Sequence, residues 1–311
     1  MRVAEYMNQW LEGKKADLQR ATYEAYTIYI GKHINPYFDK LGKSLEELVP
    51  MDVKNYVVSK RNGGRLDGKQ GGLSKVSVRK HLNVIKQAFS DAVLLGVLQV
   101  NPALVVKLPK TDSITENASF ISVDEAKKIL QAFAGHWMCP LVRITLLYGL
   151  RRSEVLGLKW SAVDFENATL TIRHTVVKNL TIEAKDGTKT KSSYRVFPLM
   201  PDIAEMLKGM VGENRGKDTY IFARENGEPL RPDSVTRGFQ RVLVRKGLQK
   251  LRFHDLRHAT ATILFDNGWE VADVQHWLGH TDIETTMNIY VAYNCTRKLA
   301  VGGSLEGLLA D

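Results

Sequence analysis

The chain has 311 residues, of which 44% are hydrophobic and 25% charged, a balance typical of one to three folded domains. Its net charge of +10 indicates a polyanionic partner, nucleic acid before a membrane surface. Two cysteines exclude a disulfide framework and a cysteine-rich zinc site. No apolar run reaches the roughly 20 residues of a membrane-spanning helix, and no signal peptide opens the chain, so we expect a cytoplasmic protein.

The positive charge is concentrated in the first third of the chain. Residues 1–110 hold 18 Lys and Arg against 10 Asp and Glu, whereas residues 111–311 hold 26 against 24. This predicts that the first part grips a polyanion and that the second part has another task. A solubilising excess of charge would give the same composition.

The first part is predicted to be helical. Apolar spacing indicates helices over residues 3–11, 18–30 and 52–61. Ser74 can cap a further long helix that ends near Leu95. That helix carries basic residues beside its apolar stripe, and we predict that they contact DNA phosphates: Lys75, Arg79, Lys80 and Lys86. An ordinary solvated helix face is the alternative.

A polar segment over residues 109–119 is expected to link this part to a second one. The second part opens with Ser122 and Glu125, which have the spacing of a capping box. Helices are expected from there to about residue 133 and over residues 140–148. They are expected to resume at positions 201, 232, 254, 270 and 281, the last with Thr281 and Glu284 as a capping box.

Between these helices the pattern changes to that of strands. β-branched alternation predicts one strand from Ala168, and a second begins at Tyr194. Polar turn residues at 185–188 separate the two, and the tip between them is rich in lysine: Lys185, Lys189 and Lys191. The whole chain is therefore expected to be mainly α with a small antiparallel β-sheet, divided into two domains.

Two segments carry residues suited to phosphate chemistry. Residues 149–154, GLRRSE, hold Arg151 with Glu154, which can keep a nearby arginine in place. Residues 251–290 hold Arg257, Tyr290 and four histidines, namely His254, His258, His276 and His280. Guanidinium groups suit a phosphate because they donate paired hydrogen bonds and stay charged.

Five ordered strings, GLRRSE, TKTKSSYRVFPL, FHDLRHATAT, LGH and TTMNIY, resemble the tyrosine recombinases, the phage-integrase-like enzymes. The resemblance covers roughly residues 3 to 292, and it is closest to integrases of phages and conjugative transposons. It implies a helical, SAM-like core-binding domain over residues 1–108 and a linker over 109–119. A mixed α+β catalytic domain over residues 120–296 and a C-terminal tail over 297–311 would follow.

The resemblance also implies a role for each site residue. Arg151 and Arg257 would bind the oxygens of the scissile phosphate, where negative charge grows in the transition state. His254 and His280 would add hydrogen bonds, and one of them would help to remove the proton of Tyr290. Tyr290, ten residues after His280, would be the nucleophile. Lys189 would be the general acid, and Glu154 the supporting acid. Neither ATP nor a metal would be needed as a cofactor.

Such an enzyme would act on double-stranded DNA as a homotetramer, with accessory DNA-bending or excision factors as further partners. The tail after Arg297 would dock on a neighbouring subunit. Lys191 is a weaker candidate than Lys189 for the general acid, and Tyr293 a weaker one than Tyr290 for the nucleophile.

Three other interpretations of these residues remain open. A relaxing type IB topoisomerase shares the same catalytic residue types, and a catalytically silent DNA-binding protein would share the fold. A zinc site is the third, because His254 with His258 and His276 with His280 have helical ligand spacing. The fixed charge of Arg257 beside a metal argues against it.

Overall fold

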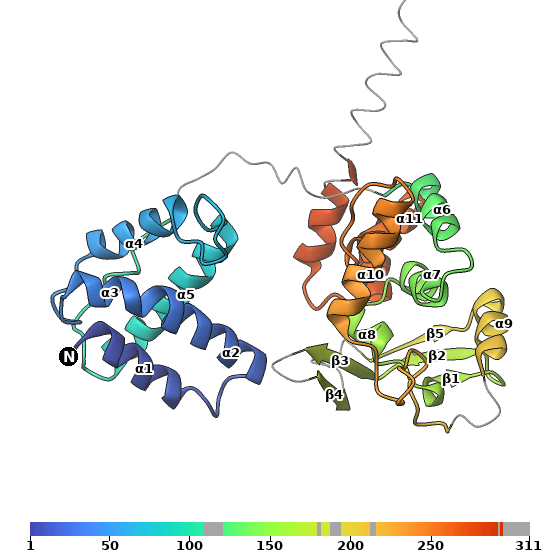
Figure 1. Ribbon diagram of the computed structural model, residues 1–311, viewed down its shortest axis with the longest axis horizontal. Helices are drawn as coiled ribbons and strands as arrows, with labels where there is room; N and C mark the ends of the chain where they lie inside the picture. The colour runs from blue at the N-terminus through green and yellow to red at the C-terminus, as the bar shows by residue number, and fades with distance from the viewer. Residues whose placement is uncertain (109–120, 179–181, 187–193, 212–215, 292, 295–311) are drawn as a thin grey trace, which may run out of the picture. The chain divides into compact units, whose positions relative to one another are not determined.

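The computed structural model describes residues 1–108, 121–178, 182–186, 194–211, 216–291 and 293–294. The chain forms two compact units, Met1–Ser113 and Ile114–Asp311 (Figure 1). The predicted linker over residues 109–119 and the tail over 297–311 lie outside the described residues.

The first unit is helical, as predicted. Its elements are α1 (Val3–Gly13), α2 (Arg20–Tyr29), the π-helical turn η1 (Ile30–Ile34), α3 (Asn35–Leu41), α4 (Pro50–Asn62) and α5 (Lys75–Leu94). The side chain of Ser74 accepts a hydrogen bond from the amide of Ser77, so the predicted cap of α5 is confirmed. The hydroxyl of Tyr6 donates to the carbonyl of Ala88 at 2.8 Å, which ties α1 to the buried face of α5.

The second unit combines helices with two small sheets. Its helices are α6 (Val123–Ala132), α7 (Cys139–Tyr148), α8 (Arg152–Leu156), η2 (Trp160–Ala162), α9 (Pro201–Met210), α10 (Pro232–Arg245), α11 (Asp255–Asp266) and α12 (Val271–Leu278), and a last helix covers residues 283–291. The strands are β1 (Val163–Asp164), β2 (Thr169–Ile172), β3 (His174–Lys178), β4 (Ile182–Asp186) and β5 (Arg195–Pro198). They form an antiparallel sheet in the order β1-β2-β5 and a separate β3-β4 hairpin.

One part of the strand prediction was wrong. Lys185 and Asp186 were expected in a turn, but both belong to β4, where they pair with Thr175 and His174 of β3. The polar residues indicated a turn, but their backbone pairs with β3 as a strand. An edge strand tolerates charged residues, so local polarity does not exclude one. The hairpin tip that was expected to carry Lys189 and Lys191 lies outside the described residues.

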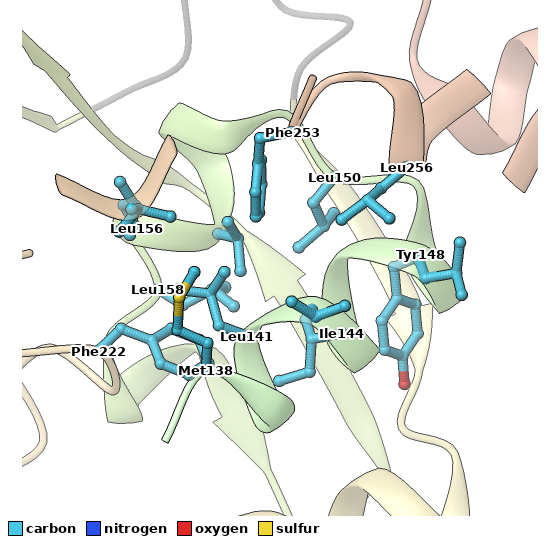
Figure 2. Packing of buried hydrophobic residues seen from close by; sticks show 14 of the residues in the cluster. Met138, Leu141, Ile144, Tyr148, Leu150, Leu156, Leu158, Phe222, Phe253 and Leu256 are labelled. Atoms are coloured by element: carbon cyan, nitrogen blue, oxygen red, sulfur yellow. The ribbon is translucent and has the colours of Figure 1, made fainter. Parts of the chain in front are cut away.

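The core of the second unit surrounds α7, which packs against α11. Figure 2 shows its apolar side chains meeting Leu150 and Leu256 from neighbouring segments. The hydroxyl of Tyr148, at the end of α7, donates to the carbonyl of Pro198 and accepts from the amide of Met200. These bonds fix the end of α7 against the end of β5, and the predicted Ser122–Glu125 capping box opens α6. The residues that follow α7 are therefore held by both a sheet and a helix.

Candidate active site

The site begins where α7 turns into α8. Gly149 ends α7 in the left-handed conformation, with φ of 62°, as expected for a glycine at a helix C-terminus. A Cβ atom there would lie 2.3 Å from Cδ2 of Leu278 at the end of α12. Only glycine therefore allows the end of α12 to approach this turn so closely.

Glu154, on α8, is buried at 1% exposure and binds two arginines. Its Oε1 accepts from Nη1 of Arg151 at 2.7 Å, and its Oε2 accepts from Nη2 of Arg195 at 2.7 Å. Oε2 also accepts from the backbone amide of Arg151 at 2.8 Å. Desolvation by burial opposes ionisation, but the charges of Arg195 and Arg151 outweigh it and lower the pKa of Glu154. The carboxylate is therefore charged and fixes the direction of Arg151, as predicted.

The last carbonyl groups of α12 gather arginines from three other elements. Arg257 of α11 donates to the carbonyls of Gly149 at 2.7 Å and Leu278 at 2.6 Å. Arg151 donates to the carbonyl of Gly279 at 3.0 Å, and Arg195 to that of Trp277 at 3.1 Å and that of Leu278. A helix C-terminus carries partial negative charge, which favours cations there. The arrangement concentrates positive charge just before His280.

His280 follows this helix end and is held from two sides. Its backbone amide donates to the carbonyl of Gln275, and its Nδ1 lies 2.7 Å from Oγ1 of the fully buried Thr286. Desolvation, followed by the charges of Arg257 and Arg151, lowers the pKa of His280 to about 3. The ring is therefore neutral at pH 7, so it can donate or accept a hydrogen bond without adding a further positive charge.

His254 stands at the start of α11, one turn before Arg257. Its ring is perpendicular to that of His258, with centroids 5.1 Å apart. Although His254 is exposed to solvent, desolvation by the surrounding protein, followed by the charges of His258, Arg257 and Arg151, lowers its pKa to about 4. The charges of the same two arginines lower the pKa values of both His254 and His280, which indicates that these four residues form one site. His258 borders this site through its ring contact with His254.

Tyr290 lies on the helix over residues 283–291, with its ring 5.1 Å from that of Phe265 and tilted by 66°. The predicted cap of this helix was wrong by one residue, because the side chain of Asp282, and not that of Thr281, accepts from the amide of Glu284. An aspartate can take that role as readily as a threonine. Three residues on, the hydroxyl of Tyr293 donates to Oδ1 of Asp266 at 2.6 Å, so the two tyrosines differ in their surroundings.

The structure thus brings four predicted residues together, namely Arg151, His254, Arg257 and His280. Glu154 supports them by binding Arg151. Lys189 lies outside the described residues. Sequence reasoning missed Arg195, although its signal was present. Strand alternation places Arg195 on the same face as the buried Phe197, and a buried arginine requires a partner carboxylate.

Two family models match the chain. The model described as phage integrase family matches residues 119–297, and a phage integrase N-terminal SAM-like domain matches residues 3–60. The chain belongs to the phage integrase family. This confirms the resemblance inferred from the motifs and the architecture of a mainly helical protein with a small antiparallel sheet.

Several proteins are similar to this integrase-family chain. A XerC-like tyrosine recombinase of Caldanaerobacter subterraneus is 32% identical over 249 residues, which is 71% of this chain and 63% of that protein. The ICEBs1 integrase of Bacillus subtilis is 24% identical over 96% of this chain and 81% of its own length. The fold is similar to that of the Tn1549 transposon integrase solved with circular intermediate DNA, with a TM-score of 0.79, 19% identity and coverage of 93% and 94% of the two chains.

The four predicted DNA-binding residues of this integrase-family chain occupy two settings on α5. Arg79 and Lys80 are exposed, whereas Lys75 and Lys86 are partly buried. Nζ of Lys86 donates to the carbonyl of Leu104 at 3.2 Å within its own unit. Arg79 and Lys80 are therefore the better placed of the four to meet a ligand.

The described residues of this integrase-family chain contain no group of three or more His, Cys, Asp or Glu side chains placed to hold a metal ion. The paired histidines of the zinc interpretation thus find no third ligand among them. Within the same residues, no helix is both long and apolar enough to span a bilayer.

Proposed function

We propose that this chain is a site-specific DNA recombinase that cuts and rejoins DNA through a 3′-phosphotyrosine on Tyr290. One observation carries the proposal. Arg151 and Arg257 donate to the carbonyls at the end of α12, His280 follows that end directly, and His254 stands one turn before Arg257, where the charges of both arginines act on it. The chain then leads directly into the helix of Tyr290. Guanidinium groups and neutral imidazoles gathered in one place suit the stabilisation of a phosphoryl-transfer transition state, and a tyrosine on the helix that follows supplies a nucleophile.

Arg151 is the cation best placed to meet the scissile phosphate. A guanidinium has five N–H donors, and in the described residues two of them bind Glu154 and Gly279. Its side chain is 32% exposed, so the remaining donors can reach the non-bridging oxygens. Arg257 is buried at 1% exposure. In this conformation Arg257 stabilises the negative charge of a bound phosphate without touching it. Direct contact between Arg257 and the phosphate requires a shift of the atoms that cover the guanidinium.

The proton transfers follow from the remaining assignments. Neutral His280 or His254 accepts the phenolic proton as the oxygen of Tyr290 attacks phosphorus. The bond from phosphorus to the 5′ oxygen breaks, and Lys189 gives that oxygen a proton, which leaves a 5′-hydroxyl. The reverse steps rejoin a strand without ATP, because the phosphotyrosine retains the energy of the broken bond.

The residues before 109 are proposed as the core-binding domain and residues 120–296 as the catalytic domain, joined by 109–119. The exposed Arg79 and Lys80, with Lys75 and Lys86, would contact the phosphates of duplex DNA. A tetramer acting in the cytoplasm, with residues 297–311 docked on a neighbour, is the proposed assembly. A similar fold occurs in a lambda integrase tetramer bound to a Holliday junction, with a TM-score of 0.67 and 19% identity.

The test uses DNA that flanks the coding region, made into nicked suicide substrates from which the cleaved end is lost. We expect a covalent complex that forms without metal or ATP and is absent in Tyr290→Phe. Tyr293→Phe is the matched control, because its hydroxyl binds Asp266 instead. A complex that survives in Tyr290→Phe, or is lost equally in both variants, contradicts the proposal.

Supercoiled plasmids with one or two copies of the same DNA separate recombination from simple relaxation. A recombinase joins two sites into defined products. Relaxation of a plasmid that lacks the site would instead indicate a topoisomerase.

A further inference from the structure

Arg195 on β5 was assigned no role by its motif, yet its guanidinium is bonded on two sides. The residue is 8% exposed and follows the exposed Tyr194. Nη2 donates to Oε2 of Glu154 at 2.7 Å, and Nη1 donates to the carbonyls of Trp277 and Leu278. One side chain therefore connects the sheet, α8 and the end of α12.

The first consequence is electrostatic. Glu154 is a buried carboxylate within hydrogen-bonding distance of Arg151, and its charge also acts on Arg257. Without a further cation, it would cancel one of the two positive charges offered to a phosphate. The ion pair with Arg195 offsets that negative charge in a low-dielectric interior, where each charge has a long reach. Arg151 and Arg257 thereby keep their positive potential.

The second consequence is geometric. Arg195, Arg257 and Arg151 use the successive carbonyls of Trp277, Leu278 and Gly279. These are the last residues before His280, so the position of its ring depends on them. Loss of the bonds from Arg195 would leave the Trp277 carbonyl without this donor and loosen the start of the His280 segment.

We propose that Arg195 is a positioning residue of the active site, which balances Glu154 and fixes the end of α12. This inference rests on the proposed function. Arg195 acts through Arg151, Arg257 and His280 and does not itself touch the scissile phosphate.

The test compares Arg195→Gln, Glu154→Gln, Arg195→Lys and the double variant Arg195→Gln with Glu154→Gln. Arg152→Gln is the matched control, because Arg152 follows Arg151 in the chain but its guanidinium donates to the hydroxyl of Thr236 at 2.6 Å instead of to Glu154. Four quantities are measured: the affinity for orthovanadate as a phosphate mimic, the single-turnover rate of covalent complex formation, the Kd for uncleaved site DNA, and Tm.

Arg195→Gln should weaken orthovanadate binding and slow cleavage about tenfold or more, while the Kd for DNA changes by less than about threefold. Most DNA affinity comes from phosphate contacts elsewhere. Adding Glu154→Gln should recover part of both losses, because it removes the unbalanced charge, and Arg195→Lys should lie between. The double variant also removes the buried carboxylate that would have lost one of its two arginine partners, so it carries the test if Arg195→Gln does not fold.

Two outcomes would overturn the inference. In the first, the losses of orthovanadate affinity and cleavage rate simply add in the double variant and follow Tm. In the second, Arg195→Gln behaves like Arg152→Gln. Orthovanadate binding that depends on Arg195 in a protein without covalent complex formation would refute the proposed function and leave the positioning role intact.

Discussion

The cation cluster and the helix that carries Tyr290 are held in very different ways. Glu154, Arg195 and Arg257 are all buried, and each makes at least two hydrogen bonds to the protein. On the helix over residues 283–291, by contrast, Ile283, Met287 and Val291 are about half exposed, and Thr286 is the residue that is fully buried. The charges are therefore preorganised, whereas the proposed nucleophile Tyr290 lies on a helix that is largely exposed over residues 283–291. A preorganised electrostatic site needs no rearrangement when charge develops on the phosphate.

The largest expected effect comes from removing Arg257 from the buried charges around Glu154. Arg257→Met should reduce the rate of covalent complex formation by about 10³-fold, because it removes a cation, leaves the carbonyl of Gly149 without this donor and takes one of two arginine donors from the carbonyl of Leu278. The rate is measured in single turnover with suicide DNA. Arg152→Met, whose guanidinium binds outside the cluster, is the control. A loss below about tenfold would show that the cluster does not need Arg257.

A second prediction concerns the close approach of α12 to the α7–α8 turn. Gly149→Ala should lower the free energy of unfolding by about 2–4 kcal/mol, because the new Cβ meets Leu278 at 2.3 Å and φ is positive. Gly135→Ala, which also has a positive φ but open space around it, should cost only about 1 kcal/mol. Denaturant unfolding measures both. Equal losses would mean that the contact with Leu278 adds nothing.

How much the sequence predicts differs between these two halves. The arginine and histidine motifs predicted the residues that meet at the end of α12, and capping signals predicted the starts of α5 and α6, because both are local patterns. Strand alternation indicates that Arg195 is buried, but its role was missed because its partner Glu154 is 41 residues away, and pairing across that separation is not visible in a local pattern. β4 was missed because only its ladder with β3 makes Lys185 part of a strand.

A third prediction concerns Thr286, on the same helix as Tyr290. Thr286→Val should slow cleavage about tenfold, because Nδ1 of His280 loses the hydroxyl that lies 2.7 Å away. The change is nearly isosteric, so Tm should fall only slightly. Thr285→Val, at an exposed neighbouring position, serves as the control. If both variants cleave equally fast, the contact does not orient His280.

The smallest expected effect is a dependence of stability on pH. Burial and the nearby arginines lower the pKa of His280 to about 3, so between pH 6.5 and 3 the unfolded chain binds a proton that the folded protein excludes. Stability should therefore fall as the pH falls through this window, and His280 should make no difference above it. In His280→Gln, the drop in Tm between pH 7 and 5 should be smaller by about 2–4 °C. An unchanged slope would contradict the lowered pKa.

The proposed reaction depends most on which tyrosine hydroxyl attacks phosphorus. The covalent complex, trapped on suicide DNA and trimmed with nuclease, can be digested with protease and sequenced by mass spectrometry. We predict a nucleotide linked through its 3′ phosphate to Tyr290, with Tyr293 unmodified. A linkage to Tyr293, to a serine, or through a 5′ phosphate would contradict the account.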